Sequence, residues 1–122
     1  MIQIESFVHV ADNVGVAVGK CIHVYRGFYK KAYAKIGDRI LLSVRKKLAR
    51  KNVKHKLFFG YLIRSRFGIL RCSGHFLRFK TNSCVVMADL ETYRGTRVKG
   101  PVSAEFRFNS FKNLTSITSC FI

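Results

Sequence analysis

The chain has 122 residues, of which 48% are hydrophobic, and this apolar content predicts one core and a single domain over 1–122. Its 23 Lys and Arg against 6 Asp and Glu give a formal net charge of +17, which predicts a polyanionic partner: RNA, DNA or an anionic membrane. Because the cations are interleaved with apolar residues, a disordered basic tail is excluded, and a folded nucleic-acid-binding domain is the leading class.

The sequence shows no membrane span and no targeting segment. Its longest largely apolar run, Leu57–Ile63, is far shorter than the roughly 20 residues that a spanning helix needs. The first residues have neither a basic stretch before an apolar core nor an amphipathic Arg- and Ser-rich pattern. We therefore expect a protein that is made where it works or that has already lost a presequence.

Short β-strands separated by turn residues are predicted for the first ninety residues. Alternating or continuous apolar patterns predict strands that start at 7 and then cover 16–25, 39–44, 57–65 and 82–87. In the second strand, Val18, Lys20, Ile22 and Val24 are expected on one face. Asp12-Asn13-Val14-Gly15 is interpreted as a turn rather than a catalytic pair, since no nucleophile or base is near in the sequence.

A basic hairpin is predicted between the fourth and the last of these strands. Its arms are 69–72 and 76–79, and Ser73-Gly74 is expected to form a two-residue turn. Together, the regular spacing of short strands and turns predicts a mainly β fold of about five strands plus this hairpin, closed into a small barrel of about residues 1–100.

Clustered cations are the strongest functional signal. Seven of them lie in 45–56 with no acid to balance them, which favours phosphate contact over a solvated face. The aromatic rings of 26–35 lie between cations and could either stack on bases or fill the rim of the barrel. The cations expected to bind RNA are Lys30, Lys31, Arg45, Lys46, Lys47, Arg50, Lys51, Lys54, Lys56, Arg64, Arg66, Arg71, Arg78 and Lys99.

A second interpretation of the basic stretch is a helix over 39–51. Ile40, Val44 and Leu48 would then align on one side, a pattern typical of helices that lie on a membrane surface. This interpretation accounts for 39–51 alone and leaves the β pattern on either side unexplained.

Gly95–Val102 is predicted to be a stiff extended segment. Alternation sends Arg97 and Lys99 to one side and Val98 to the other, and the two glycines allow sharp turns or a close backbone approach. Pro101 is expected to push Gly100 towards extended geometry.

The period then changes to that of a helical segment over about 101–122. Ser103 can cap a short helix over 104–107, and a second helix is predicted over Asn109–Thr118 with Phe111, Leu114 and Ile117 on one side.

Neither a metal site nor a cofactor nor an enzyme is predicted. Cys72, His75 and Cys84 could supply three zinc ligands, but no fourth lies nearby, so we expect buried, reduced thiols. The six acids are scattered and form no grouping with a nucleophile or a base at a recognisable spacing.

Over nearly its whole length the chain resembles the family of universal large-subunit ribosomal protein fourteen, in its bacterial and organellar form. The segments that match, in order, are Met1-Ile2-Gln3, Val10-Ala11-Asp12-Asn13 with Gly15, Cys21-Ile22 with Val24, Ile36-Gly37-Asp38, Val53-Lys54, Arg78-Phe79, Gly95-Thr96-Arg97-Val98, Gly100-Pro101-Val102, Glu105 with Arg107, Phe111 and Ser116. Each segment is weakly diagnostic alone, but their order and spacing are specific.

The resemblance implies a barrel with a protruding ribbon and a C-terminal helical segment, in a structural constituent of the ribosome. It implies binding to large-subunit rRNA at the subunit interface, neighbouring large-subunit proteins and a bridge to small-subunit rRNA. It also implies that a ribosome silencing factor docks around Thr96, Arg97 and Lys112.

The chain departs from the family pattern in three ways. His55-Lys56-Leu57 replaces a usual glycine, Ser119-Cys120-Phe121-Ile122 lacks the usual proline, and Phe, Tyr and Cys are unusually frequent. This drift indicates an organelle-encoded protein of the mitochondrial matrix, with the bacterial cytoplasm or a plastid as alternatives. The alternative function is a free-standing, basic, OB-like protein that binds single-stranded nucleic acid.

Overall fold

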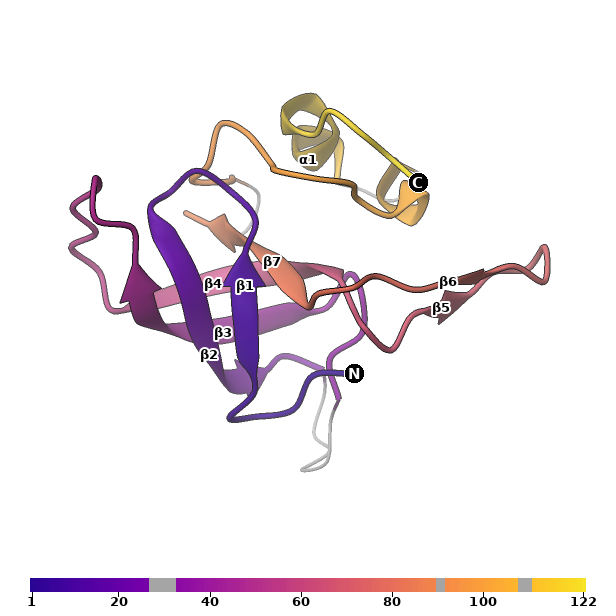
Figure 1. Ribbon diagram of the computed structural model, residues 1–122, viewed down its shortest axis with the longest axis horizontal. Coiled ribbons are helices and arrows are strands. Elements are labelled where there is room, and N and C mark those ends of the chain that lie inside the picture. The colour runs from indigo at the N-terminus through magenta and orange to yellow at the C-terminus, as the bar shows by residue number, and fades with distance from the viewer. Residues whose placement is uncertain (27–32, 90–91, 108–110) are drawn as a thin grey trace.

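The computed structural model describes residues 1–26, 33–89, 92–107 and 111–122. Its main feature is a closed barrel with the strand order β1-β2-β3-β4-β7, in which β1 and β7 pair in parallel and all other neighbours are antiparallel (Figure 1). These strands are β1 (Phe7–Val10), β2 (Val16–Val24), β3 (Arg39–Lys47), β4 (Leu57–Arg64) and β7 (Ser83–Met87). The predicted five-stranded barrel is confirmed.

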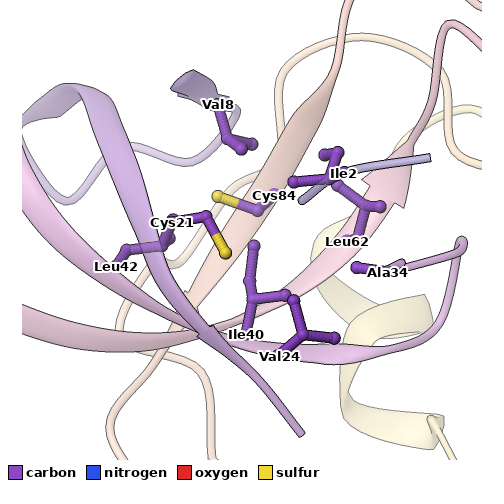
Figure 2. Close-up of a cluster of buried hydrophobic side chains, with 9 residues drawn as sticks. All are labelled: Ile2, Val8, Cys21, Val24, Ala34, Ile40, Leu42, Leu62 and Cys84. Atoms are coloured by element: carbon purple, nitrogen blue, oxygen red, sulfur yellow. The ribbon is translucent and has the colours of Figure 1, made fainter. Parts of the chain in front are cut away.

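Small and β-branched side chains fill the barrel. Figure 2 shows Val8, Cys21, Ile40, Leu62 and Cys84 pointing towards one another from five different strands. All five are fully buried, and the Cys84 thiol donates to the His9 carbonyl at 3.5 Å. Because every strand of the barrel contributes to one core, the positions of the loops at its ends are fixed relative to one another.

The strand β2 does not alternate as predicted. Its register against β3 shifts between Val16 and Val18, between Val18 and Gly19, and between Cys21 and His23. Cys21 and Val24 are therefore both buried although they are three residues apart, and Ile22 is exposed. An extra residue at a bulge resets which face of a strand points inward, so the expected shared face of residues 18–24 is wrong.

The strand β3 settles how the basic stretch folds. Pairing with β2 and β4 extends it from Arg39 to Lys47, three residues beyond the predicted end. The helix over 39–51, and with it the membrane-surface interpretation, is wrong because both edges of β3 are paired. Among the described residues, no helix is long and apolar enough to cross a membrane.

The strands β5 (Ile69–Leu70) and β6 (Phe76–Leu77) form a separate two-stranded ribbon that extends away from the barrel (Figure 1). Its turn is not the predicted two-residue turn. The Gly74 amide donates to the Arg71 carbonyl and the Arg71 amide to the His75 carbonyl, each at 2.9 Å, so three residues form the loop. Gly74 has φ +83°, the left-handed geometry that such three-residue loops require.

Residues 93–107 and 111–122 form a C-terminal layer against one side of the barrel (Figure 1). Val98 pairs with both Asp12 and Thr118, and Val102 pairs with Phe121. Ile63 of β4 packs in one cluster with Phe106 and Leu114 of the layer. A second core therefore joins the layer to the barrel.

The layer contains the predicted helical elements in a shorter form. A 3-10 helix, η1 (Ala104–Arg107), has the predicted bounds, but the Ser103 hydroxyl donates to the Glu105 carboxylate instead of capping the helix. The α-helix α1 (Lys112–Ile117) lies inside the predicted 109–118 and buries Leu114; residues 108–110 lie outside the described part.

Candidate nucleic-acid interface

The basic stretch 45–56, hereafter the basic loop, comprises the end of β3 and the connection to β4. Val53 anchors it by packing with Val16 and Phe58, and only 8% of Val53 is exposed. The Leu48 amide also donates to the Gly15 carbonyl at 2.8 Å. The loop is therefore held against the barrel and does not depend on a ligand for its position.

Two of its seven cations hold the loop in place. The Lys47 ammonium donates to the Val53 carbonyl at 2.7 Å, and the Lys51 ammonium donates to the Asn13 carbonyl. The other five side chains are exposed and form no hydrogen bond or ion pair with any described residue: Arg45, Lys46, Arg50, Lys54 and Lys56. A charge without an internal partner is available to a phosphate.

Arg64, at the end of β4, is half-buried. Its Nη2 donates to the Lys99 carbonyl at 2.9 Å, while Nε is buried without a hydrogen-bond partner in the described part of the chain. Burial lowers the pKa of this guanidinium. The contact positions the backbone of Lys99, whose own side chain is exposed.

Arg71, at the ribbon, is engaged by the C-terminal layer. Its Nε donates to Glu105 Oε1 at 2.6 Å, and its Nη2 donates to the Ile122 carbonyl at 2.6 Å. Hydrogen bonding to Arg71 lowers the pKa of Glu105. Arg71 thus ties the ribbon to the layer, and its contact with RNA stays a prediction. The sequence could not reveal this pairing, because the two partners are 34 residues apart.

Arg66 and Arg78 lie together where the ribbon leaves the barrel. Arg78 Nε donates to the Arg66 carbonyl at 2.8 Å, and both side chains are exposed. They line a hollow of about 460 Å³ together with Tyr33 and Phe67. No sequence pattern indicates Phe67, because a lone ring after a strand carries no local signal of function.

The segment 95–102 docks on the turn that follows β1. Asn13 donates from Nδ2 to Thr96 Oγ1 at 2.8 Å and accepts from the Thr96 amide at 3.0 Å. A Cβ on Gly95 would lie 2.7 Å from Asp12 Cβ, so only glycine permits this approach. The close approach expected at Gly95 is present, but the atoms that approach belong to the Asp12 and Asn13 side chains and not to another backbone.

The buried Asp12 carboxylate stabilises this turn through two hydrogen bonds. It accepts from the Val14 amide at 3.1 Å and from the Val86 amide at 2.7 Å, which confirms the turn interpretation. Burial raises its pKa although both amides oppose the shift. Asp12 is therefore a structural residue that joins β7 to the turn carrying Asn13.

The side chains of the segment 95–102 alternate between buried and exposed as predicted. Val98 is 1% exposed, whereas Arg97 and Lys99 are exposed. Gly100 is not extended as expected but has φ +82°, a left-handed geometry that a Cβ would strain. Arg97 has no hydrogen bond or ion pair to any residue within the described ranges.

The cations do not form one patch. The basic loop and the ribbon extend from opposite sides of the barrel, and the C-terminal layer with Arg97, Lys99 and Lys112 lies over a third side (Figure 1). Lys112 is exposed at the first residue of α1, whereas Val98 pairs beyond the other end of that helix, at Thr118. The predicted Lys30 and Lys31 lie outside the described residues.

The cysteines only partly match the expectation of buried thiols. Cys21 and Cys84 are buried in the barrel (Figure 2), but Cys72 and Cys120 are exposed, so the expectation is wrong for those two. Burial raises the pKa of Cys21 to about 11 and that of Cys84 further still. Within the described ranges, no three His, Cys, Asp or Glu side chains gather as a metal site.

A closed, strongly basic barrel with unpaired cations on projecting loops defines a class of small proteins that bind a polyanion. The family model described as ribosomal protein L14p/L23e matches residues 1–122, and the chain belongs to this family. It is accordingly a structural constituent of the large ribosomal subunit, from a non-enzymatic family whose members associate with rRNA and with ribosomal proteins.

Proposed function

We propose that the chain binds large-subunit rRNA at the subunit interface mainly through the phosphates of the RNA backbone. The observation that carries this proposal is the basic loop, which is anchored by Val53 and presents five cations without partners among the described residues. Preformed positive charge captures phosphates without a cost in ordering the loop. Arg66, Arg78 and Lys99 add exposed charge on two other sides, which suits a protein embedded among several RNA segments.

We further propose that the segment 95–102 contributes to an intersubunit bridge. Its support is the exposed Arg97 on a backbone held by Asn13 and Val98. A guanidinium offers a planar set of donors that can bind a phosphate of small-subunit rRNA, or a carboxylate of a silencing factor, with two hydrogen bonds. Lys112, in the same C-terminal layer, extends this surface.

The proposed location is the mitochondrial matrix, in the large subunit of an organellar ribosome. It is supported by the 11 Phe, 5 Tyr and 4 Cys of the chain and by the departures around His55 and Cys120. The bacterial cytoplasm and a plastid are the alternatives.

Sedimentation of a native lysate through a sucrose gradient, with an antibody against this chain, tests the assignment. We expect the protein with large subunits and with joined ribosomes, and its release into the top fractions after ribonuclease treatment. If the protein stays at the top of the gradient of an untreated lysate, the ribosomal assignment fails and a free-standing single-strand-binding protein replaces it. Fractionation of purified organelles alongside the cytosol decides the location.

A further inference from the structure

Three segments that are distant in sequence build one hollow at the base of the ribbon. It has a volume of about 460 Å³ and is lined by Gln3, Tyr33, Arg66, Phe67, Arg78 and Asn82, among others. This volume lies within the roughly 300–1,000 Å³ of typical ligand sites. We call it the ribbon-base groove.

Backbone pairing orients the first two of its walls. Ile2 and Ala34 form a bridge with hydrogen bonds of 3.1 and 2.8 Å, and both side chains are fully buried. Since successive side chains of an extended backbone point to opposite faces, the neighbours Gln3 and Tyr33 point away from the core and into the groove. Tyr33 is 39% exposed.

Side chains hold the opposite wall. The Arg66 amide donates to Asn82 Oδ1 at 2.8 Å, and the Phe67 amide donates to Ser65 Oγ at 3.2 Å. These bonds, with that from Arg78 to the Arg66 carbonyl, define the backbone from which Arg66 and Phe67 project. The groove is therefore built without a ligand, while Phe67 is still 56% exposed.

Every charged side chain among the described residues that line the groove is positive. Arg66 and Arg78 also line an adjoining hollow of about 330 Å³ with Phe79 and Lys80. Among the described residues that line them, the two hollows present three cationic side chains and no carboxylate. Exposed rings beside guanidinium groups match the needs of an unpaired nucleotide, whose base stacks on a ring while its phosphates meet the cations.

We propose that the ribbon-base groove binds an unpaired nucleotide of RNA, with its base against Phe67 and Tyr33 and its flanking phosphates on Arg66 and Arg78. The inference rests on the proposed function in taking this RNA to be rRNA. The Gln3 side-chain amide and the Asn82 NH2 group can form hydrogen bonds with the edge of a base. Purely electrostatic binding would leave both rings unused.

If the groove stacks a base, the chain should bind an RNA strand that carries its bases more tightly than an abasic strand with the same backbone. The test measures binding of the full chain to a ten-nucleotide single-stranded RNA and to its counterpart with an abasic central segment, at equal salt. We expect about tenfold tighter binding of the intact strand. The double substitution Tyr33→Leu and Phe67→Leu should abolish this preference while leaving the salt dependence unchanged, because no charge is lost.

Matched variants separate stacking from general damage. Phe76→Leu is the control, since Phe76 is 58% exposed on the same ribbon but does not line the groove, and it should keep the preference. Phe67→Tyr should also keep it, because the ring remains. Urea unfolding of each variant verifies that it folds.

Each outcome decides one point. If the double variant keeps the preference, or if the wild type shows none, the groove is not a stacking site, and the sedimentation result for the ribosome is unaffected. If the wild type shows the preference but never sediments with large subunits, the groove stands and the ribosomal assignment of its RNA falls.

Discussion

At the scale of single residues, Arg64 and Gly100 illustrate how a half-buried cation shapes the segment 95–102. A Cβ on Gly100 would lie 2.3 Å from Arg64 Nη1, and Gly100 has φ +82°. Gly37 is a matched control, because it has φ +93° but nothing within 4 Å of the position of a Cβ.

We therefore predict that Gly37→Ala costs about 1–2 kcal/mol, the strain of a left-handed backbone alone. Gly100→Ala should cost a further 1–2 kcal/mol or so, because it also displaces Arg64 from the Lys99 carbonyl. Urea unfolding of the purified chain measures both. In an Arg64→Ala background the two substitutions should cost the same; a gap that persists there would contradict this account.

The ion pair between Arg71 and Glu105 predicts a pH dependence. In the folded state, hydrogen bonding to Arg71 lowers the pKa of Glu105 below its usual 4.5. A lowered folded-state pKa stabilises the protein fully above pH 4.5, and this stabilisation is lost as the pH falls from there through the lowered value. Glu105→Gln should therefore be less stable than the wild type at neutral pH, and the difference should shrink on acidification.

Unfolding midpoints between neutral and acidic pH, for the wild type, Glu105→Gln and Arg71→Gln, check this prediction. In both variants the unfolding midpoint should depend less on pH than in the wild type, and to the same extent. The double variant should show no further reduction of this pH dependence. If the stability difference between the wild type and Glu105→Gln instead grows as the pH falls, the ion pair does not stabilise the fold in the way proposed.

At the scale of elements, the basic loop separates cations that hold the fold from cations that face solvent. The substitutions Lys46→Gln, Arg50→Gln and Lys54→Gln remove three charges without internal partners and should leave stability nearly unchanged. They should weaken rRNA binding and reduce the slope of log affinity against log salt by about 2–3, since each phosphate contact contributes about 0.7–0.9.

The pair Lys47→Gln and Lys51→Gln is the structural counterpart, because these ammonium groups bind backbone carbonyls. It should lower stability as well as binding. Filter binding over a series of salt concentrations, together with urea unfolding, distinguishes the two sets. An unchanged slope for the triple variant would remove the loop from the RNA interface.

The segment 95–102 is predicted to act after assembly, not in folding. Arg97 is exposed, so Arg97→Ala should change the free energy of unfolding by less than about 0.5 kcal/mol. It should instead impair the joining of purified large and small subunits, measured by light scattering, or the docking of a silencing factor. Thr96→Val is the comparison, since it loses the hydrogen bond from Asn13 and should destabilise the segment. If Arg97→Ala unfolds the free chain while assembled subunits join normally, Arg97 is structural.

At the scale of the whole molecule, the net charge of +17 opposes the compact state when no RNA is bound. Raising sodium chloride from about 0.1 M to about 1 M shortens the Debye length from about 10 to about 3 Å and screens this repulsion. We predict that the melting temperature of the free chain rises over this range. The triple loop variant, with a net charge of 17 − 3 = +14, should respond less. A melting temperature that is flat or falls with salt would show that self-repulsion does not limit stability.

Local patterns in the sequence determined the elements of this protein. Strand periodicity and turn residues predict the five barrel strands, the ribbon and the helical tail, because these depend on neighbours along the chain. The family segments, kept in order, predict the membership that the family model establishes. The same local rules were wrong where a bulge reset β2 and where Gly74 formed a three-residue loop.

Only the tertiary structure decided what each cation does. Arg71 and Lys46 look alike in sequence, but the Arg71 side chain binds Glu105 of the C-terminal layer, whereas the Lys46 side chain forms no hydrogen bond or ion pair with a described residue. The ribbon-base groove likewise joins Tyr33, Phe67 and Asn82 across the chain. Whether a cation is paired within the protein or free to bind RNA depends on partners that only the closure of the barrel brings near. Sequence patterns report neighbours along the chain, so they do not predict these partners.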